Sequence, residues 1–385
     1  MPALAPILLA IPWVLAPIVA IVRASHSRSL DEERDTPPAN APLVSLVIPA
    51  RNEAHNIRRC VESALASSYP RLEVIVVDDH STDDTGAIAW ELAERDARVR
   101  VLTPPPLPAG WFGKQWACSA GAEASGGEII GFLDADTWQA DDLVTRVVNA
   151  MASRNADLLS VAGTQDLGSF WERLVQPQVF GVLAQRYGGT EEVNRSRFAS
   201  QKIANGQCLW VRRAAYVEMG GHGAVRDKVA EDLALGQHWF RAGRTVSLVL
   251  GLEQLTTRMY TSLAELNAGW GKNIYAGGRD AMPFGAMGRV LFPFALVAPS
   301  VFQLAPPVVL VLAMLGALGH GALMWSAITF AANVVWWALV YAWLRYSPLY
   351  ALLHPLGAAT LLYIALGAMV RGRRVRWKER DYVVT

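Results

Sequence analysis

The chain has few cysteines, and they form no recognisable pattern. Cys60, Cys118 and Cys208 are the only three among 385 residues, and no C-x-x-C pair occurs. Such isolated cysteines argue against a disulfide framework and fit a reducing compartment. They also lack the spacing of a zinc site, so we expect small, buried apolar side chains.

The lack of a strong net charge and of a glycine-rich loop argues against two classes of function. The net charge is only +1, so there is no global basic field of the kind that attracts nucleic acid. A dinucleotide-binding site needs a G-x-G-x-x-G loop directly after the first strand. Here the first predicted strand, 43–48, is followed by Pro49-Ala50-Arg51-Asn52-Glu53, which contains no glycine. We therefore exclude a dehydrogenase of that type.

Charged side chains are missing from three long stretches, residues 1–22, 290–344 and 346–370. Each is long enough for at least one membrane-spanning helix. The first lacks a basic start and a small-x-small cleavage site, which favours an uncleaved anchor over a signal peptide. We predict an anchor at 1–22, a linker at 23–42, a catalytic domain at 43–285, a C-terminal membrane region at 290–370 and a basic tail at 371–385.

The basic residues predict the orientation in the membrane. Arg23, Arg28 and Arg34 follow the first apolar run and none precedes it, which places the globular domain in the cytoplasm. The basic tail should also be cytoplasmic, which requires an even number of C-terminal crossings. The simplest division gives three, at about 291–317, 322–344 and 348–370. Because the first of these contains four prolines, its part 290–302 can instead lie in the interface or re-enter, so two or three spans remain open.

Between the apolar stretches, strands alternate with helices. We expect strands at 43–48, 73–77, 99–102, 129–133 and 207–211, and helices at 54–67, 84–95, 115–124 and 233–241. This alternation predicts an α/β domain with a mostly parallel sheet and helices on both faces. Ligands bind such sheets at the carboxyl ends of the strands, where polar clusters follow the strands in this chain.

One of these clusters is a D-x-D motif, Asp134-Ala135-Asp136, directly after strand 129–133. Read alone, it is best explained as a solvated strand end, since Asp and Thr favour turns and helix starts. The other interpretation is functional. Two hard carboxylate ligands beside an open position suit Mg²⁺ or Mn²⁺ that bridges a diphosphate.

Four motifs together favour the functional interpretation of the D-x-D motif over the solvated strand end. Ser45–Asn56 (SLVIPARNEAHN), Val76–Thr85 (VVDDHSTDDT), Phe132–Thr137 (FLDADT) and Glu231–Leu233 (EDL) occur in the order seen in family-2 glycosyltransferases of the GT-A fold. The resemblance covers about residues 43–275. Within that family the chain most resembles a membrane-bound branch that glycosylates carotenoid or hopanoid-type lipids. The segments shared with that branch are Gly110–Lys114, Asn205–Gln207 and Trp270–Asn273.

The resemblance implies roles for the polar residues at the strand ends. Glu53 and Asp79 would contact the nucleobase and ribose, with Asp78 close by. Lys114, at a glycine-flanked turn before a helix, would meet a phosphate, although a solvated surface lysine is also possible. Asp136 would hold the metal, and Asp134 the ribose or the metal. The expected nucleotide-sugar-binding residues are Pro49, Arg51, Glu53, Asp78, Asp79, Lys114 and Asp134. Ser81 and Asp83 we expect only to form turns and caps.

The E-D pair is implied to be catalytic. Asp232 would act as the general base on the acceptor hydroxyl, with Glu231 in a supporting role, and the anomeric carbon would invert. Without the resemblance, the two acids would be read as complementing a helix dipole. Asn205, Gly206, Trp270 and Lys272 are candidate acceptor-site residues. The Q-x-x-R-W segment of processive polysaccharide synthases is absent, since this region reads Ala268-Gly269-Trp270-Gly271-Lys272-Asn273.

The sequence thus predicts a membrane-bound, metal-dependent, inverting glycosyltransferase. The donor would be a nucleotide-sugar such as a UDP-hexose, and the acceptor a carotenoid or hopanoid-type lipid. A polysaccharide or polyprenyl-phosphate sugar synthase has the same chemistry with another acceptor. A non-catalytic membrane scaffold is the remaining alternative, against which the intact D-x-D and E-D motifs argue.

Overall fold

The computed structural model describes residues 4–280, 282, 285–372, 374–377 and 380–383. The chain forms two compact units. The helical unit comprises the described residues of 1–26, 167–189 and 260–372, and the sheet unit those of 27–166, 190–259 and 373–385. Parts of the predicted basic tail, residues 373, 378–379 and 384–385, lie outside the described residues.

The sheet unit is organised around a seven-stranded sheet in the order β3-β2-β1-β4-β8-β6-β9. Strand β8 runs antiparallel to its neighbours β4 and β6, and the other pairs are parallel, so the mostly parallel sheet is confirmed. The strands are β1 (Val44–Ala50), β2 (Leu72–Asp78), β3 (Val99–Leu102), β4 (Ile129–Leu133), β6 (Leu158–Ala162), β8 (Cys208–Arg212) and β9 (Val246–Leu250).

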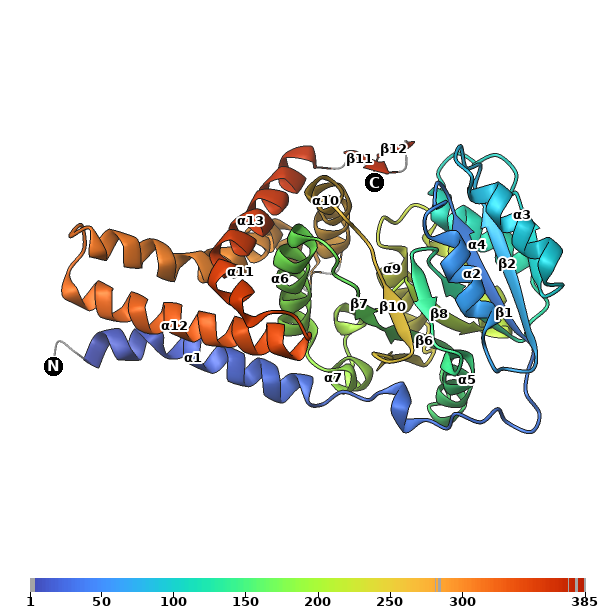
Figure 1. The fold of residues 1–385 in the computed structure, drawn as a ribbon, viewed down its shortest axis with the longest axis horizontal. Coiled ribbons are helices and arrows are strands. Elements are labelled where there is room, and N and C mark those ends of the chain that lie inside the picture. Colours follow the sequence, from blue (N-terminus) through green and yellow to red (C-terminus); the bar gives the residue numbers. More distant parts are fainter. Residues whose placement is uncertain (1–3, 281, 283–284, 373, 378–379, 384–385) are drawn as a thin grey trace. The chain divides into compact units, whose positions relative to one another are not determined.

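Helices cover both faces of this sheet (Figure 1). Side chains of a strand alternate between faces, and the central strands are apolar on both. Leu46 and Ile48 of β1 belong to one core, and Val47 to the other. The first core is completed by α2 (Ile57–Leu65), α3 (Thr85–Arg95) and α5 (Leu143–Ser153), the second by α4 (Gly113–Ala124), α8 (Arg213–Glu218) and α9 (Glu231–Arg241). Two buried faces explain the continuous apolar runs in β1, β2 and β4.

Smaller elements complete the sheet unit. They are a three-stranded sheet of β5 (Thr137–Gln139), β10 (Leu255–Thr257) and β7 (Thr164–Gln165), a hairpin of β11 (Arg374–Trp377) and β12 (Arg380–Val383), the helix α7 (Thr190–Arg195), and the 3-10 turns η1 (Leu30–Glu32), η2 (Ala199–Gln201) and η3 (Gly221–Val225).

Part of the predicted linker 23–42 is packed rather than loose. Leu30 in η1 is fully buried, and Arg146 of α5 donates to the carbonyl of Glu33 at 2.7 Å. The segment therefore forms a strap against α5.

The helical unit contains α1 (Leu4–Ala24), α6 (Phe170–Tyr187), α10 (Leu263–Asp280), α11 (Gly285–Met314), α12 (His320–Trp343), η4 (Pro348–Leu353) and α13 (His354–Arg371). Among the described residues, four stretches are long and apolar enough to cross a membrane: Leu4–Ala24, Gly285–Met314, His320–Trp343 and Pro348–Arg371. Helix α11 continues through all four of its prolines. That its part 290–302 lies in the interface or re-enters stays a prediction. Apolar helices tolerate proline where neighbouring groups satisfy the freed carbonyls. The number of crossings stays a prediction.

Tryptophans join the long helices of this unit. Trp13 of α1 stacks on Phe302 of α11 with ring centroids 4.0 Å apart, and its indole nitrogen donates to the carbonyl of Phe302 at 3.0 Å. Trp325 of α12 donates to the carbonyl of Leu9 at 3.2 Å. Satisfied polar groups of this kind hold helices together where the surroundings are as apolar as the helices themselves.

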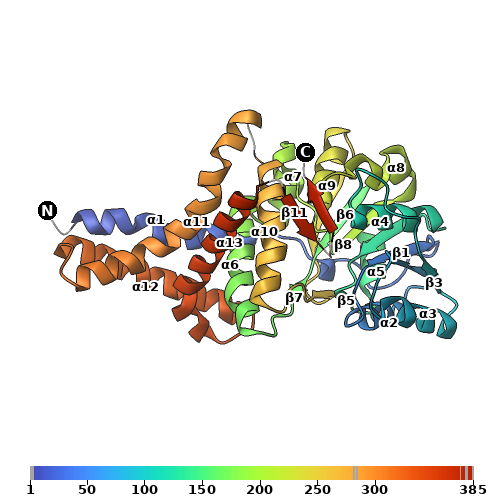
Figure 2. The ribbon, with the colours of Figure 1, turned by 90° about the horizontal axis from the view of Figure 1, so that it is seen from above.

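Helices α6 and α10 lie beside α13 within this unit (Figure 2). The compact units therefore divide the chain differently from the predicted domains, which placed both helices in the catalytic part 43–285. The physical reason is visible at Trp270, which is only 7% exposed and packs its ring edge-on against Phe180 and Tyr260.

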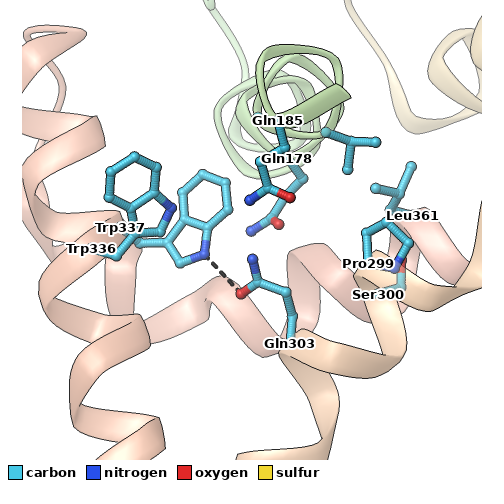
Figure 3. A pocket seen from close by; sticks show the side chains of 10 residues that line it. Gln178, Gln185, Pro299, Ser300, Gln303, Trp336, Trp337 and Leu361 are labelled. Carbon is cyan, nitrogen blue, oxygen red and sulfur yellow. Dashed lines mark hydrogen bonds between the residues drawn. The ribbon is translucent and has the colours of Figure 1, made fainter. Parts of the chain in front are cut away.

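A polar pocket lies inside the helical unit, among α6, α11, α12 and α13. Figure 3 shows the amides of Gln178, Gln185 and Gln303 turned toward one another. Gln303 accepts a hydrogen bond from the indole nitrogen of Trp337 at 3.0 Å. Gln178 and Ser300 are both nearly fully buried here. Polar side chains among apolar helices are costly unless paired. Here Gln303 is paired with Trp337, whereas Gln178 Nε2 and Ser300 Oγ are buried without a hydrogen-bond partner among the described residues.

Gly131 tests the packing that positions the D-x-D turn. A methyl group there would lie 2.7 Å from Leu46 and 2.8 Å from the Trp210 ring. Because two central strands would have to shift, Gly131→Ala should lower the free energy of unfolding by about 1–3 kcal/mol. The measurement is the melting temperature of the full chain in detergent. Gly126→Ala is the control, since its methyl group would meet only ordinary contacts, at 3.5 Å or more. Equal melting temperatures for the two variants would contradict this account of the packing.

Candidate active site

The polar motifs converge at the carboxyl end of the central strands. β1, β2 and β4 are parallel neighbours in the order β2-β1-β4, so the loops that follow them emerge at one edge of the sheet. Antiparallel β8 begins at the same edge, since Cys208 pairs with Leu133, the last residue of β4. The Asn205-Gly206 segment therefore lies beside the D-x-D turn, and Asp134 donates its backbone N–H to the carbonyl of Gln207 at 3.1 Å.

Lys114 holds the centre of this edge. Its ammonium nitrogen lies 2.7 Å from Asp134 Oδ1 and 2.8 Å from Glu231 Oε1, and it donates to the carbonyl of Gly206 at 3.3 Å. The lysine comes from the first turn of α4, and Glu231 from the first turn of α9. Three segments far apart in sequence are thus joined by one cation.

The electrostatics of this cluster follow from burial and mutual charge. Burial lowers the pKa of Lys114, but the carboxylates of Asp134 and Glu231 outweigh it and hold that pKa well above its usual value. Burial raises the pKa of Asp134, and Lys114 only partly opposes the rise. For Asp232, burial and the neighbouring Glu231 raise the pKa to about 6. The lysine therefore stays charged, whereas burial makes Asp134 and Asp232 easier to protonate than ordinary aspartates.

Asp232 is fixed by two backbone donors. Its Oδ2 accepts the N–H of Gly206 at 2.7 Å, and its Oδ1 accepts the N–H of Leu233 at 2.7 Å. Gly206 permits this approach because a side chain would crowd the site: a methyl group there would lie 3.0 Å from Asp232 Oδ2 and 3.1 Å from the Lys114 ammonium. The motif N-G-Q, predicted for the acceptor, thus also positions the predicted base.

The D-x-D turn is held by its own backbone. The carbonyl of Asp134 accepts the N–H of Thr137 at 3.1 Å and its hydroxyl at 2.7 Å, and the carbonyl of Asp136 accepts the N–H of Arg258 at 3.1 Å. Among the described residues, no group of three or more His, Cys, Asp or Glu side chains could hold a metal ion. Two carboxylates nevertheless suit Mg²⁺ or Mn²⁺, which usually take one or two protein carboxylates and complete their shell with water and substrate phosphates.

The loops after β1 and β2 are tied to each other. Arg51 donates to the carbonyls of Asp79 at 2.6 Å and His80 at 3.0 Å. Asn52 and His80, one in each loop, have positive φ angles of 52° and 55°. Such strained backbone is uncommon outside glycine and collects at functional sites. Pro49 lies in β1 just before this junction, opposite Val77 of β2.

Ser81 and Asp83 have the structural roles expected of them. Ser81 accepts the N–H of Asn52 at 3.0 Å, and Asp83 accepts the N–H groups of Ala54 and Thr85. They bind the two loops together and initiate α3.

The carboxylates expected at the nucleotide are placed around this junction. Asp78 accepts the N–H of Ser81 at 3.1 Å, and Glu53 accepts from the side chain of Asn56 at 2.8 Å. Glu53 is also close enough to Asp134 to contribute to the raised pKa of that carboxyl. Asp79 is 3% exposed and forms an ion pair with Arg380. Arg380, from the C-terminal hairpin, carries no recognisable motif, so sequence reasoning missed it.

The candidate acceptor residues are divided between the two units. In the sheet unit, the side-chain amide of Asn205 donates to the carbonyl of Val161 at 2.9 Å and to Gln207 Oε1 at 3.2 Å. Trp270 and Lys272 belong to α10 of the helical unit. Their acceptor roles stay predictions.

The three cysteines are free and buried, and His222 is also buried. Burial lowers the pKa of His222 to about 4 although Glu231 opposes it, so the ring is neutral, and it is hydrogen-bonded to the hydroxyl of Tyr216 at 2.8 Å.

Comparison with known proteins agrees with this geometry. Residues 45–220 match the family model described as glycosyl transferase family 2. These residues form a family 2 glycosyltransferase domain. The match contains the loops after β1 and β2, the D-x-D turn and Gly206, while the E-D pair lies just beyond it.

Similar proteins of known function are 4,4'-diaponeurosporenoate glycosyltransferases. That of Staphylococcus haemolyticus is 26% identical over 258 residues, which cover 66% of this chain and 66% of the relative. That of Staphylococcus aureus strain MRSA252 is 27% identical over 264 residues, which cover 67% and 68%. The chain thus spans about two thirds of the length of these relatives.

A solved structure with the same fold is the mannosyltransferase PcManGT from Pyrobaculum calidifontis, in complex with GDP-Man and Mn²⁺. It is 18% identical, the comparison covers 97% of this chain and 100% of that one, and the TM-score is 0.54. The family 2 domain therefore has the GT-A fold, as predicted.

Lys114→Met tests the charge balance of the site. The buried acids take up protons more readily in the folded than in the unfolded chain, so their charge destabilises the fold above their raised pKa values. Without the lysine, this penalty grows. We expect a melting temperature well below wild type at about pH 7.5, and a smaller deficit at about pH 5.5, where Asp232, with its pKa of about 6, is mostly protonated.

The control is Lys228→Met, which removes a partly exposed lysine whose partner is the neighbouring Asp227. That variant should follow the wild-type pH profile. A deficit for Lys114→Met that does not change with pH would mean that packing, rather than charge, explains it.

Proposed function

We propose that this protein is a membrane-bound, inverting glycosyltransferase that moves a hexose from a nucleotide-sugar, such as a UDP-sugar, to a lipid acceptor. The observation that carries the proposal is the Lys114 cluster. It holds the D-x-D acid Asp134 and the E-D acid Glu231 on one ammonium, with the Asp232 carboxylate fixed beside them by Gly206. Donor chemistry and acceptor chemistry would therefore meet at one edge of the sheet.

Asp232 is the proposed general base. Its two backbone hydrogen bonds fix the carboxylate, and a second lone pair on each oxygen remains for an acceptor hydroxyl. Its pKa of about 6 makes it a stronger base than an ordinary aspartate, while it is still ionised at neutral pH. Attack by the activated oxygen from the face opposite the diphosphate would invert the anomeric carbon.

Asp136 and Asp134 would hold a divalent metal ion at the donor diphosphate. When bound, such an ion neutralises the charge that develops on the leaving group. The Mn²⁺ and GDP-Man named with the Pyrobaculum structure support a metal and nucleotide-sugar site on this fold. Glu53, Asp78 and Asp79, with the Pro49–Arg51 segment, would bind the nucleoside. Lys114 would reach a phosphate by exchanging one of its present carboxylate partners.

A lipid acceptor fits the rest of the chain. Four helices of spanning length would keep the enzyme in the bilayer, where an apolar acceptor is dissolved. The staphylococcal relatives are named for a carotenoid carboxylic acid, which supports a carotenoid or similar lipid as the acceptor. The basic residues that follow α1 would keep the catalytic part on the cytoplasmic side of a multi-pass protein.

Asp232→Asn is the decisive variant. The amide keeps the shape of the side chain but cannot take a proton, so transfer should fall about 100-fold or more. The measurement is lipid mass spectrometry on cells that express the full chain, where the wild type should add the mass of one hexose to a lipid. Asp227→Asn, a change of a partly exposed acid in the loop before α9, is the matched control.

Wild-type transfer by Asp232→Asn would refute the assignment of the base. A water-soluble polymer or an acid-labile phosphodiester as the product would instead indicate a polysaccharide or polyprenyl-phosphate sugar synthase. Melting temperatures near wild type for both variants would show that folding is not responsible.

The pH dependence should report the same carboxylate. Since the base must be ionised, kcat/KM should fall about tenfold per unit below about pH 6 and level off above it. The measurement is the rate of transfer at low acceptor concentration in detergent or nanodiscs. If kcat/KM instead begins to fall only near pH 4, which is close to the pKa of an ordinary aspartate, the result would contradict the raised pKa of Asp232.

A further inference from the structure

The C-terminal hairpin contributes an arginine to the donor side of the sheet unit. Arg380, at the start of β12, donates from Nη1 to Asp79 Oδ2 at 2.5 Å and from Nη2 to Asp79 Oδ1 at 3.1 Å. Both oxygens of the carboxylate are therefore bound by one guanidinium. This fork-to-fork geometry is the strongest form of an arginine–carboxylate pair.

Asp79 cannot move away from this contact. Its backbone N–H donates to the carbonyl of Ala50 at 2.8 Å, and its own carbonyl accepts from Arg51 at 2.6 Å. The residue is thus anchored between the loops that follow β1 and β2. Its side chain is 5% exposed and that of Arg380 20%, so the guanidinium leaves no open face on the carboxylate.

We propose that Arg380 closes the nucleoside subsite in the donor-free protein and that the donor must displace it from Asp79. The proposal rests on the proposed function, in which Asp79 accepts hydrogen bonds from the nucleoside. A nucleobase N–H or a ribose hydroxyl needs the same oxygens that Arg380 occupies. The nucleotide and the hairpin arginine therefore compete for one carboxylate.

This competition gives the C-terminus a regulatory role at the donor site. A site that is open for only part of the time binds its ligand with an affinity reduced by the open fraction. Donor binding would release Arg380 and with it the start of β12, so the state of the hairpin would report whether the site is loaded. The link is local to the sheet unit, to which both residues belong.

Arg380→Ala provides the test. Binding of UDP with MgCl₂ to the full chain in nanodiscs is measured by calorimetry. Removal of a charge-assisted, bidentate competitor should tighten binding about tenfold. Arg380→Lys, which keeps the charge but not the fork, should show a smaller gain. Arg95→Ala is the control for net charge, since Arg95 is an exposed arginine paired with Glu91 within α3.

A second comparison isolates the pair. In an Asp79→Asn background, we expect weaker binding of UDP than in the wild type. Adding Arg380→Ala should not tighten UDP binding there, because the partner of Arg380 has lost its charge. Melting temperatures of all variants show whether each is folded.

The outcomes separate the inference from the function on which it rests. If the wild type binds UDP and Arg380→Ala binds it equally or more weakly, the competition is overturned, and weaker binding would make Arg380 a ligand of the donor. If Arg380→Ala tightens UDP binding by the same factor in the Asp79→Asn background, its effect does not depend on Asp79, and the proposal is also wrong. If neither protein binds UDP, GDP or their hexose conjugates with metal, the proposed function fails first and this inference with it.

Discussion

The active-site edge depends on the ion pairs of Lys114. Asp134, Glu231 and Asp232 come from two segments about 100 residues apart, and their charges would repel one another in a partly buried site. A single ammonium between Asp134 and Glu231 makes their approach tolerable. The compensation is incomplete, since the pKa values of Asp134 and Asp232 remain raised. A raised pKa of this kind would make Asp232 a stronger base than an ordinary aspartate, as the proposed function requires.

The glycine at position 206 serves the same arrangement. A backbone N–H reaches Asp232 only because no side chain stands between Asp232 and Lys114. The N-terminal turn of α9 supplies a second N–H from Leu233. Two fixed donors orient the carboxylate without a dedicated side chain, and helix N-termini favour negative charge. The position of the Asp232 carboxylate is thus set by backbone N–H groups, which can move less than a side chain can.

The loops predicted to bind the nucleoside are built differently. Two loops are joined by Arg51, Ser81 and Asp83, and each loop contains one residue with positive φ. Carboxylates at this junction are held by neighbours, and Asp79 is covered by an arginine from the other end of the chain. The predicted base and the predicted nucleoside carboxylates therefore lie at one sheet edge, where Asp232 is held by backbone donors and Asp79 is covered by Arg380.

Much of the fold was predictable from sequence because its signals are local. Buried parallel strands require continuous apolar runs, and the carboxyl ends of β1, β2 and β4 are marked by polar clusters such as Asp78-Asp79 and Asp134-Ala135-Asp136. The absence of charge in three long stretches marked the apolar helices equally well. The four prolines of α11 do not interrupt the helix, because interior prolines are tolerated where neighbouring groups satisfy the freed carbonyls.

By itself, the sequence predicted β1, β2, β3, β4 and β8 of the main sheet, the apolar stretches that form the long helices, and the set of candidate acids. It did not predict β6 and β9. Only the tertiary structure decided which charges meet. Lys114 reads as a solvated or phosphate-binding lysine in sequence, and becomes the counter-ion of Asp134 and Glu231 in space. Arg380 reads as one basic residue in a basic tail, and lies on Asp79. Ion pairs depend on distances in space between segments that are separate in sequence, up to 301 residues apart for Asp79 and Arg380, which no local pattern of side chains encodes.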